Sequence, residues 1–150
     1  MKEFVLTDDA KKMLLERPPN LSTLIVEKGH VQRFAESIGD DNPVYFDIEY
    51  AKSLGYKNII APPTFLRCME PAPPKHSELI QLQNILDGGS EWEYIMNVFV
   101  GDTITSSTII KSVTQRNTKV GTSVFVIGQT SYSNQDNVLI ATQKFTYIKY

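Results

Sequence analysis

The sequence predicts an α+β fold in which an antiparallel sheet wraps around a helix. In the first half of the chain, apolar residues recur at i, i+3 and i+4, the spacing that places them on one face of a helix. From Glu91 onward they alternate with a period of two, which is typical of strands that bury one face. Three long consecutive strands must cover that face, and the apolar helical segments at residues 31–38 and 63–70 supply the partner.

The composition is that of one globular domain. At roughly 100–200 residues per domain, a chain of 150 residues predicts a single domain over residues 1–150. A hydrophobic content of 41% excludes a disordered chain, and a net charge of −2 lacks the positive excess of a nucleic-acid binder. No apolar run approaches the ~20 residues that span a bilayer. One cysteine, Cys68, and two scattered histidines exclude an internal disulfide and a structural zinc site. We therefore expect a soluble, cytoplasmic protein with no metal or cofactor and no membrane association.

The first expected elements are short. Thr7 and the two aspartates after it predict a helix start, and the prolines after Arg17 end that helix. Residues 21–26 are apolar and β-branched, which predicts a strand. Residues 31–38 carry apolar side chains at i, i+3, i+4 and i+7, and Gly39 follows at the position that favours a helix end.

Three further helices are expected before the sheet, over residues 47–55, 63–70 and 76–86. Asp47 is a favourable N-cap for the first of these helices. Its apolar residues are expected to point inward: Tyr50, Ala51 and Leu54. The second helix begins at a proline, which is tolerated in a first turn, and the prolines beyond residue 70 prevent its continuation. The third carries an apolar stripe.

The second half of the chain predicts strands joined by polar turns. The expected strands are residues 92–100, 103–114, 120–132 and 138–147. The expected turns are residues 101–102, 116–119 and 133–137. The apolar stripe of the first strand is expected to pack in the core: Trp92, Tyr94, Met96 and Val98. Gly128 indicates a bulge or bend in the third strand.

The most informative cluster of residues is Gly39-Asp40-Asp41-Asn42-Pro43, followed at a short distance by residues 59–65. As a loop after a helix, this run requires no function. Glycine supplies a positive φ, Asp and Asn bond their own backbone, and proline restrains the exit. Alternatively, a loop carboxylate such as Asp40, held by a rigid turn, serves as an acid or base. Spacing alone leaves both interpretations open.

The chain resembles the MaoC-like hydratase/dehydratase family. The resemblance rests on Ile-Gly-Asp-Asp-Asn-Pro-Val-Tyr-Phe-Asp at residues 38–47 and Ile-Ile-Ala-Pro-Pro-Thr-Phe-Leu at residues 59–66, with weaker matches at residues 101–105 and 132–135. It is closest to the N-terminal half-domain type, which pairs with a separate catalytic subunit. The resemblance implies a single hotdog fold, a curved antiparallel sheet around one helix that pairs edge to edge with a second hotdog. It also implies an acyl thioester of coenzyme A or an acyl carrier protein as ligand.

Two departures from the family pattern indicate a chain without catalytic activity of its own. Active members read Gly-Asp-x-Asn-Pro-(aliphatic)-His, and their Asp and His position and deprotonate water. Here Asp40 matches the Asp, but Tyr45 stands in place of the His. A tyrosine, with a pKa of ~10 against ~6.5 for histidine, is a poor base near neutral pH. Pro63 replaces the glycine whose N–H polarises the thioester carbonyl, and proline has no N–H to donate.

We therefore expect this chain to be the substrate-holding half of an (R)-specific enoyl-thioester hydratase or 3-hydroxyacyl-thioester dehydratase. A partner hotdog subunit would supply the histidine and the N–H donor. Asp40, at the family's catalytic position, is expected to persist mainly as a turn residue. The resemblance places the following residues near the substrate: Asn42, Tyr45, Pro63, Thr64 and Phe65.

Two other functions remain open on the same scaffold, because one fold hosts many activities. An acyl-CoA thioesterase would need a carboxylate on the helix that follows residue 63, where Glu70 is the acid available. A binding module would hold acyl thioesters as a homodimer without turnover.

Overall fold

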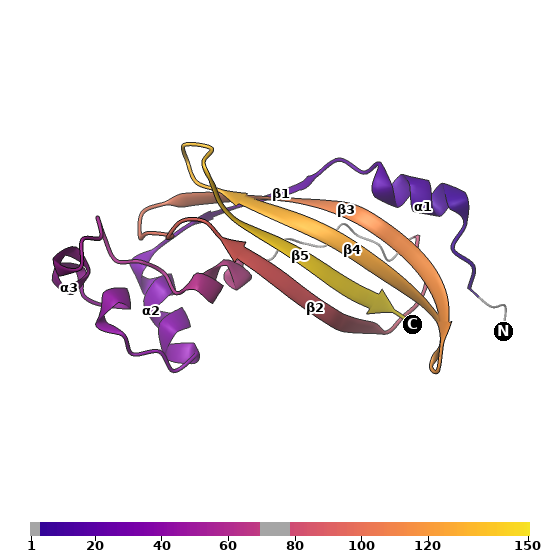
Figure 1. Cartoon of the computed structure of the whole chain (residues 1–150), viewed down its shortest axis with the longest axis horizontal. Coiled ribbons are helices and arrows are strands. Elements are labelled where there is room, and N and C mark those ends of the chain that lie inside the picture. Colours follow the sequence, from indigo (N-terminus) through magenta and orange to yellow (C-terminus); the bar gives the residue numbers. More distant parts are fainter. Residues whose placement is uncertain (1–3, 70–78) are drawn as a thin grey trace.

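The computed structural model describes residues 4–69 and 79–150. Its strands form one antiparallel sheet in the order β1-β3-β4-β5-β2 (Figure 1). They are β1 (Asn20–Ile25), β2 (Ile85–Tyr94), β3 (Thr103–Thr118), β4 (Gly121–Ser133) and β5 (Leu139–Lys149). The helices are α1 (Asp8–Leu15), α2 (Lys28–Ser37) and α3 (Ile48–Ser53), with the 3-10 helices η1 (Pro43–Tyr45) and η2 (Pro63–Cys68). The predicted α+β class is therefore confirmed.

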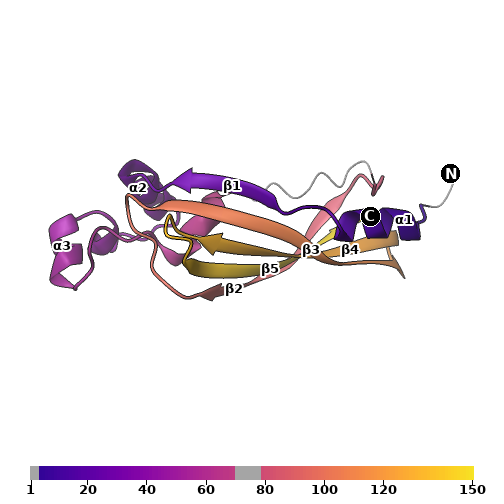
Figure 2. The same cartoon turned by 90° about the horizontal axis from the view of Figure 1, so that it is seen from above.

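The helices cover the two ends of the sheet. Figures 1 and 2 show α2 and α3 together at one end and α1 at the other, with the long strands between them. The buried residues form two clusters that follow this division. The first joins the helical end to the sheet and includes Val31, Ala35, Tyr45, Phe65, Ile104 and Tyr132. The second lies near α1 and includes Leu14, Ile80, Ile110, Val113, Val126 and Tyr147.

Local capping explains why the short helices begin where the sequence predicted. The hydroxyl of Thr7 accepts a hydrogen bond from the backbone N–H of Ala10 at 3.2 Å, and the carboxylate of Asp47 accepts one from the N–H of Glu49 at 2.8 Å. The expected inward orientation of Tyr50 and Leu54 is wrong. Both are exposed, because α3 has only six residues and buries a single small side chain, that of Ala51.

The chain between residues 76 and 100 differs most from its prediction. Residues 76–78 of the expected helix lie outside the described residues, residues 79–84 are not helical, and the strand β2 already begins at Ile85. The expected strand does not reach residue 100, because the chain leaves the sheet after Tyr94. The N–H groups of Ile95 and Met96 both donate to the carbonyl of Ile140 there. Tyr94, the last residue of β2, and Met96 beyond it are both exposed, against the core packing that alternation predicts.

Strands β3 and β4 form a hairpin that is longer than expected. The predicted turn at residues 116–119 is wrong, since β3 continues to Thr118, which pairs with Gly121. A bulge lies further along β3, where Lys111 is an extra residue between the pairs Ile110–Gly128 and Ser112–Ile127. The sequence predicted an irregularity at Gly128, and the structure places the extra residue on the strand opposite it.

The helix predicted to begin near Pro63 is the 3-10 helix η2, and its expected last residue, Glu70, lies outside the described residues. No helix within residues 4–69 and 79–150 is both long and apolar enough to cross a membrane.

Candidate functional site

Tyr45 and Pro63, the two residues that replace the family's histidine and glycine, lie on the wall of one small cleft. The cleft has a volume of about 110 Å³. Tyr45 belongs to the 3-10 helix η1, and Pro63 is the first residue of η2. The other residues that line it are Ile60, Ala61, Pro62, Leu66, Tyr94, Met96, Asn97 and Val98. The sequence-predicted pair is thus brought together by the fold.

The phenol of Tyr45 stays protonated at neutral pH. Its side chain is only 8% exposed, and burial raises its pKa above the ordinary value, with smaller contributions from the charge of Asp40 and from Tyr56. All three causes act in the same direction. A neutral phenol donates a hydrogen bond, but it does not take a proton from water.

Asp40 and Asn42 bond to the backbone of their own loop. The carboxylate of Asp40 accepts a hydrogen bond from the N–H of Asn42 at 3.2 Å, and the Asn42 side chain accepts one from the N–H of Val44 at 3.2 Å. Gly39 precedes them with a φ of 71°, which favours glycine. These bonds form the self-bonded turn that the non-functional interpretation of the loop predicts.

The remaining predicted residues separate into surface and core. Thr64 is exposed, whereas Phe65 is 1% exposed and packs edge-to-face on Phe34 with ring centroids 5.7 Å apart. Phe65 therefore packs in the core. Cys68, the single cysteine, is exposed.

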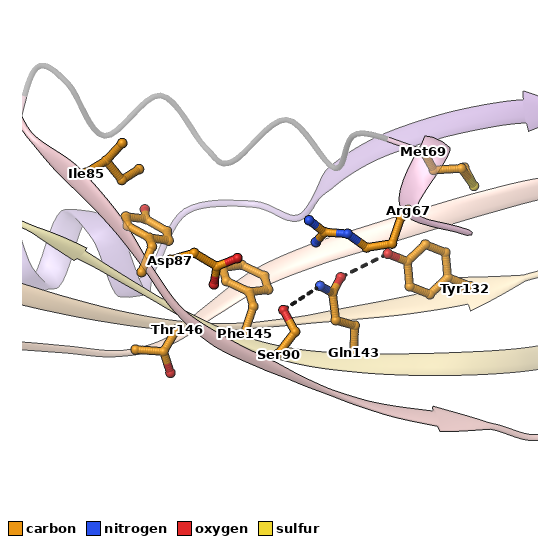
Figure 3. A pocket seen from close by; sticks show the side chains of 10 residues that line it. Arg67, Met69, Ile85, Asp87, Ser90, Tyr132, Gln143, Phe145 and Thr146 are labelled. Carbon is orange, nitrogen blue, oxygen red and sulfur yellow. Dashed lines mark hydrogen bonds between the residues drawn. The ribbon is translucent and has the colours of Figure 1, made fainter. Parts of the chain in front are cut away.

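A larger pocket lies between η2 and the strands β2, β4 and β5. Its volume is about 530 Å³, within the usual range for small-molecule sites. Its lining comes from η2, β2, β4 and β5 and from Met69: Arg67, Met69, Ile85, Asp87, Ser90, Tyr132, Gln143, Phe145, Thr146 and Tyr147 (Figure 3). Leu66 lines the small cleft and the next residue, Arg67, lines this pocket, so η2 contributes to the walls of both cavities.

A bulge in β2 places two polar side chains in the larger pocket. Asp87 pairs with Tyr147 and Gly89 with Thr146, so that Gly88 is an extra residue. In a regular strand, residues three apart face opposite sides of the sheet. The extra residue lets both Asp87 and Ser90 face the pocket.

Three polar side chains form a chain of hydrogen bonds along the pocket wall. The phenol of Tyr132 donates to Oε1 of Gln143 at 3.1 Å, and Nε2 of Gln143 donates to the hydroxyl of Ser90 at 3.1 Å (Figure 3). Burial raises the pKa of Tyr132 to about 12, although Arg67 nearby and a hydrogen bond with Thr130 lower it. Tyr132 is therefore a donor at neutral pH. We call these residues the Tyr132–Gln143–Ser90 relay.

The relay residues were missed at the sequence level. Gln143 offers the one readable signal, since it occupies a position on β5 whose same-face neighbours are Ala141, Phe145 and Tyr147, and it is 3% exposed. A polar residue on an otherwise apolar face indicates a buried hydrogen-bond network. Within residues 4–69 and 79–150, no three His, Cys, Asp or Glu side chains gather in a group that could hold a metal ion.

The strand order and the helical segments at one end of the sheet agree with the hotdog fold that the resemblance implies (Figure 1). The chain belongs to the family described as the FAS1-like dehydratase domain region, whose model matches residues 20–143. A UPF0336 protein of Streptomyces avermitilis is 37% identical over 93 residues, which are 59% of this chain and 62% of that protein. The chain thus matches somewhat less than two thirds of that relative's length.

Solved structures share the fold at low sequence identity. The crystal structure of the ChsH1–ChsH2 complex from Mycobacterium tuberculosis aligns with a TM-score of 0.78 at 20% identity, covering 95% of this chain and 94% of that one. The HadBC (3R-hydroxyacyl-ACP dehydratase) complex from the same organism aligns with a TM-score of 0.72 at 21% identity, covering 87% and 96%. At these identities the likeness establishes the hotdog fold.

Proposed function

We propose that this chain is the acyl-thioester-binding, non-catalytic half of a two-hotdog hydratase or dehydratase. The unit would interconvert a trans-2-enoyl thioester and its (R)-3-hydroxyacyl form, on coenzyme A or an acyl carrier protein. The observation that carries the proposal is the phenol of Tyr45. It stands where active relatives have a general base, and burial and the charge of Asp40 both raise its pKa. A second protein must then supply the base.

Pro63 supports the same division of labour. In active relatives the amide at this position polarises the thioester carbonyl, and such donors contribute strongly to acyl chemistry. Pro63 lines the cleft beside Tyr45 but has no N–H. That Tyr45 and Pro63 line one cleft supports the proposal that this chain keeps the family's binding position while lacking both of its reactive groups.

The two cavities that η2 lines suit a thioester with a long acyl group. The small cleft has room for little more than the thioester end, whereas the larger pocket of about 530 Å³ has the volume for an acyl chain. Arg67 and Leu66 are adjacent residues on η2 that face different cavities. A ligand that passes beside η2 would contact both.

The partner is proposed to bind along β2. This strand is at the edge of the sheet, opposite the other edge strand β1 (Figure 1). Large apolar side chains remain exposed on it and just beyond it: Ile85, Leu86, Tyr94, Ile95 and Met96. An open apolar edge is a template for pairing with another chain, and edge pairing is how the resemblance predicts that two hotdogs meet.

The test compares the chain alone with the chain mixed with a MaoC-like subunit that carries the histidine. We expect no hydration of a trans-2-enoyl-CoA by the chain alone and hydration by the mixture. The loss of the enoyl absorbance measures the reaction. Turnover by the lone chain that Asp40→Asn abolishes would contradict the proposal. Release of free thiol from acyl-CoA that Glu70→Ala abolishes would instead identify a thioesterase. Ligand-dependent thermal stabilisation without turnover in any pairing would identify a binding homodimer.

A further inference from the structure

One face of the sheet carries a buried row of polar side chains across three neighbouring strands. Thr108, Thr130 and Gln143 are directly paired on β3, β4 and β5, so their side chains lie in one row on the same face. Each is at most 3% exposed, and the hydroxyls of Thr108 and Thr130 are 2.9 Å apart. The last member of the row, Gln143, lines the larger pocket.

The relay leaves donors unused at the pocket wall. Gln143 has two N–H donors, and its one hydrogen bond as a donor goes to Ser90. The hydroxyl of Ser90 accepts this bond, so its own proton has no acceptor among the described residues. A buried amide with an unmade N–H costs free energy unless a ligand or water pairs with it. The wall of the pocket therefore offers two hydrogen-bond donors.

The charged residues of the pocket also favour an acceptor near Gln143. Arg67 contributes a guanidinium that makes no ion pair within residues 4–69 and 79–150, and it lies at the Tyr132 end of the pocket (Figure 3). Asp87 lies nearer Ile85 in that view, and its carboxylate already accepts the N–H of Gly89 at 2.8 Å. The end of the pocket near Gln143 is thus rich in donors.

From this arrangement we infer that the acyl group bound in the larger pocket carries an oxygen acceptor, a keto or carboxylate oxygen, beyond its thioester. The inference rests on the proposed function, because it names the kind of acyl group that the binding subunit holds. A plain alkyl chain would displace water from the N–H of Gln143 and from the hydroxyl of Ser90, but it could not accept a hydrogen bond from either. An acceptor oxygen satisfies both and lies within the field of Arg67.

The test measures the affinity of the full chain for matched acyl-CoA probes. Pairs of equal length are compared, one with a plain alkyl chain and one with a keto or terminal carboxyl oxygen, over several lengths. Trp92 is the single tryptophan of the chain and stacks on Tyr132 with ring centroids 5.4 Å apart, so its fluorescence reports binding beside the relay. We expect the oxygenated probe of the best length to bind roughly three- to tenfold more tightly than its plain partner.

Variants separate a ligand-binding role of the relay from a purely structural one. Ser90→Ala removes the exposed end of the relay. In this variant the ratio of the affinities for the oxygenated and the plain probe should be close to one. Gln143→Met should do the same if it folds. Ser131→Ala, next to Tyr132 on the opposite face of β4, is the matched control and should keep the preference. If the chain prefers the carboxyl probe and Arg67→Gln removes that preference, the acceptor on the natural ligand is charged. If the chain prefers the keto probe, the acceptor is neutral.

The outcomes distinguish this inference from the proposed function. Equal affinity for plain and oxygenated probes, or a preference that survives Ser90→Ala, overturns the inference and leaves acyl-thioester binding intact. Failure to bind any acyl-CoA, alone or with the histidine-bearing subunit, overturns the proposed function itself.

Discussion

The ring of Phe145 occupies the space where a side chain at Gly128 would lie. A Cβ atom at Gly128 would overlap Cζ of Phe145, far inside contact distance. The two residues are directly paired across β4 and β5, and the missing side chain lets the ring fold down onto the sheet at the edge of the larger pocket. This contact explains the glycine without a bend in its own strand.

We expect Gly128→Ala to lower the free energy of unfolding by about 1–3 kcal/mol, because the methyl group overlaps an aromatic ring in the core. Urea unfolding checks the change. Gly29→Ala is the matched control, since no atom lies within 4 Å of a Cβ there and the residue is in α2. It should leave stability unchanged or raise it by up to about 1 kcal/mol. Equal effects of the two substitutions would contradict the packing described.

Tyr132 predicts a specific dependence of stability on alkaline pH. An unfolded chain ionises tyrosine near pH 10, whereas burial raises the pKa of Tyr132 to about 12. The fold thus favours the neutral phenol, a contribution that is fully present below pH 10 and is lost as the pH rises from 10 to 12. Relative to Tyr132→Phe, the wild type should lose about 2–3 kcal/mol across that window. Parallel curves for the two proteins would refute this, and Tyr50→Phe, on exposed α3, is the control.

Two neighbouring acids test whether Asp40 holds its loop. Asp40→Ala removes the acceptor of the Asn42 N–H and should lower the free energy of unfolding by about 0.5–1.5 kcal/mol. Asp41→Ala makes the same change of charge at an exposed position and should change stability by less than about 0.5 kcal/mol. Chemical denaturation of both variants provides the comparison. A larger effect at Asp41 would show that the turn is held differently.

The proposed partner interface predicts a local effect of charge on β2. Leu86→Lys places a cation on the exposed edge strand and should weaken association with the histidine-bearing subunit at least tenfold, with little effect on folding. Val120→Lys makes a similar change at the turn between β3 and β4, where the valine is 66% exposed. Sedimentation velocity of the mixtures measures the association. Equal weakening by both variants would argue against binding along β2.

Elements with a local chemical cause could be predicted from the sequence. Thr7 and Asp47 cap their helices through their own side chains, and the hairpin that leads into β5 follows from a run of polar residues. The family loop was located for the same reason, because Asp40 and Asn42 bond to the backbone two residues on.

Elements decided by distant contacts could not be predicted. The alternation from Trp92 to Val98 favours a continuous strand, but the pairing of Ile95 and Met96 with Ile140 ends it. Leu79, Ile80 and Leu82 have helix-like spacing, yet they pack against the cluster around Leu14 without forming a helix. The larger pocket combines η2, β2, β4 and β5, and two of its polar residues depend on the bulge at Gly88. No spacing rule in the sequence joins these segments.

The bulge at Lys111 determines which residues of β3, the longest strand, point toward the core. Ile110 and Val113 are both buried although they are three residues apart, since the extra lysine resets the inward and outward alternation between them. Removing that one residue would move the side chains of one half of β3 to the other face of the sheet. Either the row from Ile104 to Ile110 or Val113 would then be exposed to water. Length changes in this arm of the hairpin are therefore tolerable only in twos, whereas the tip at residues 119–120 is free to vary by single residues.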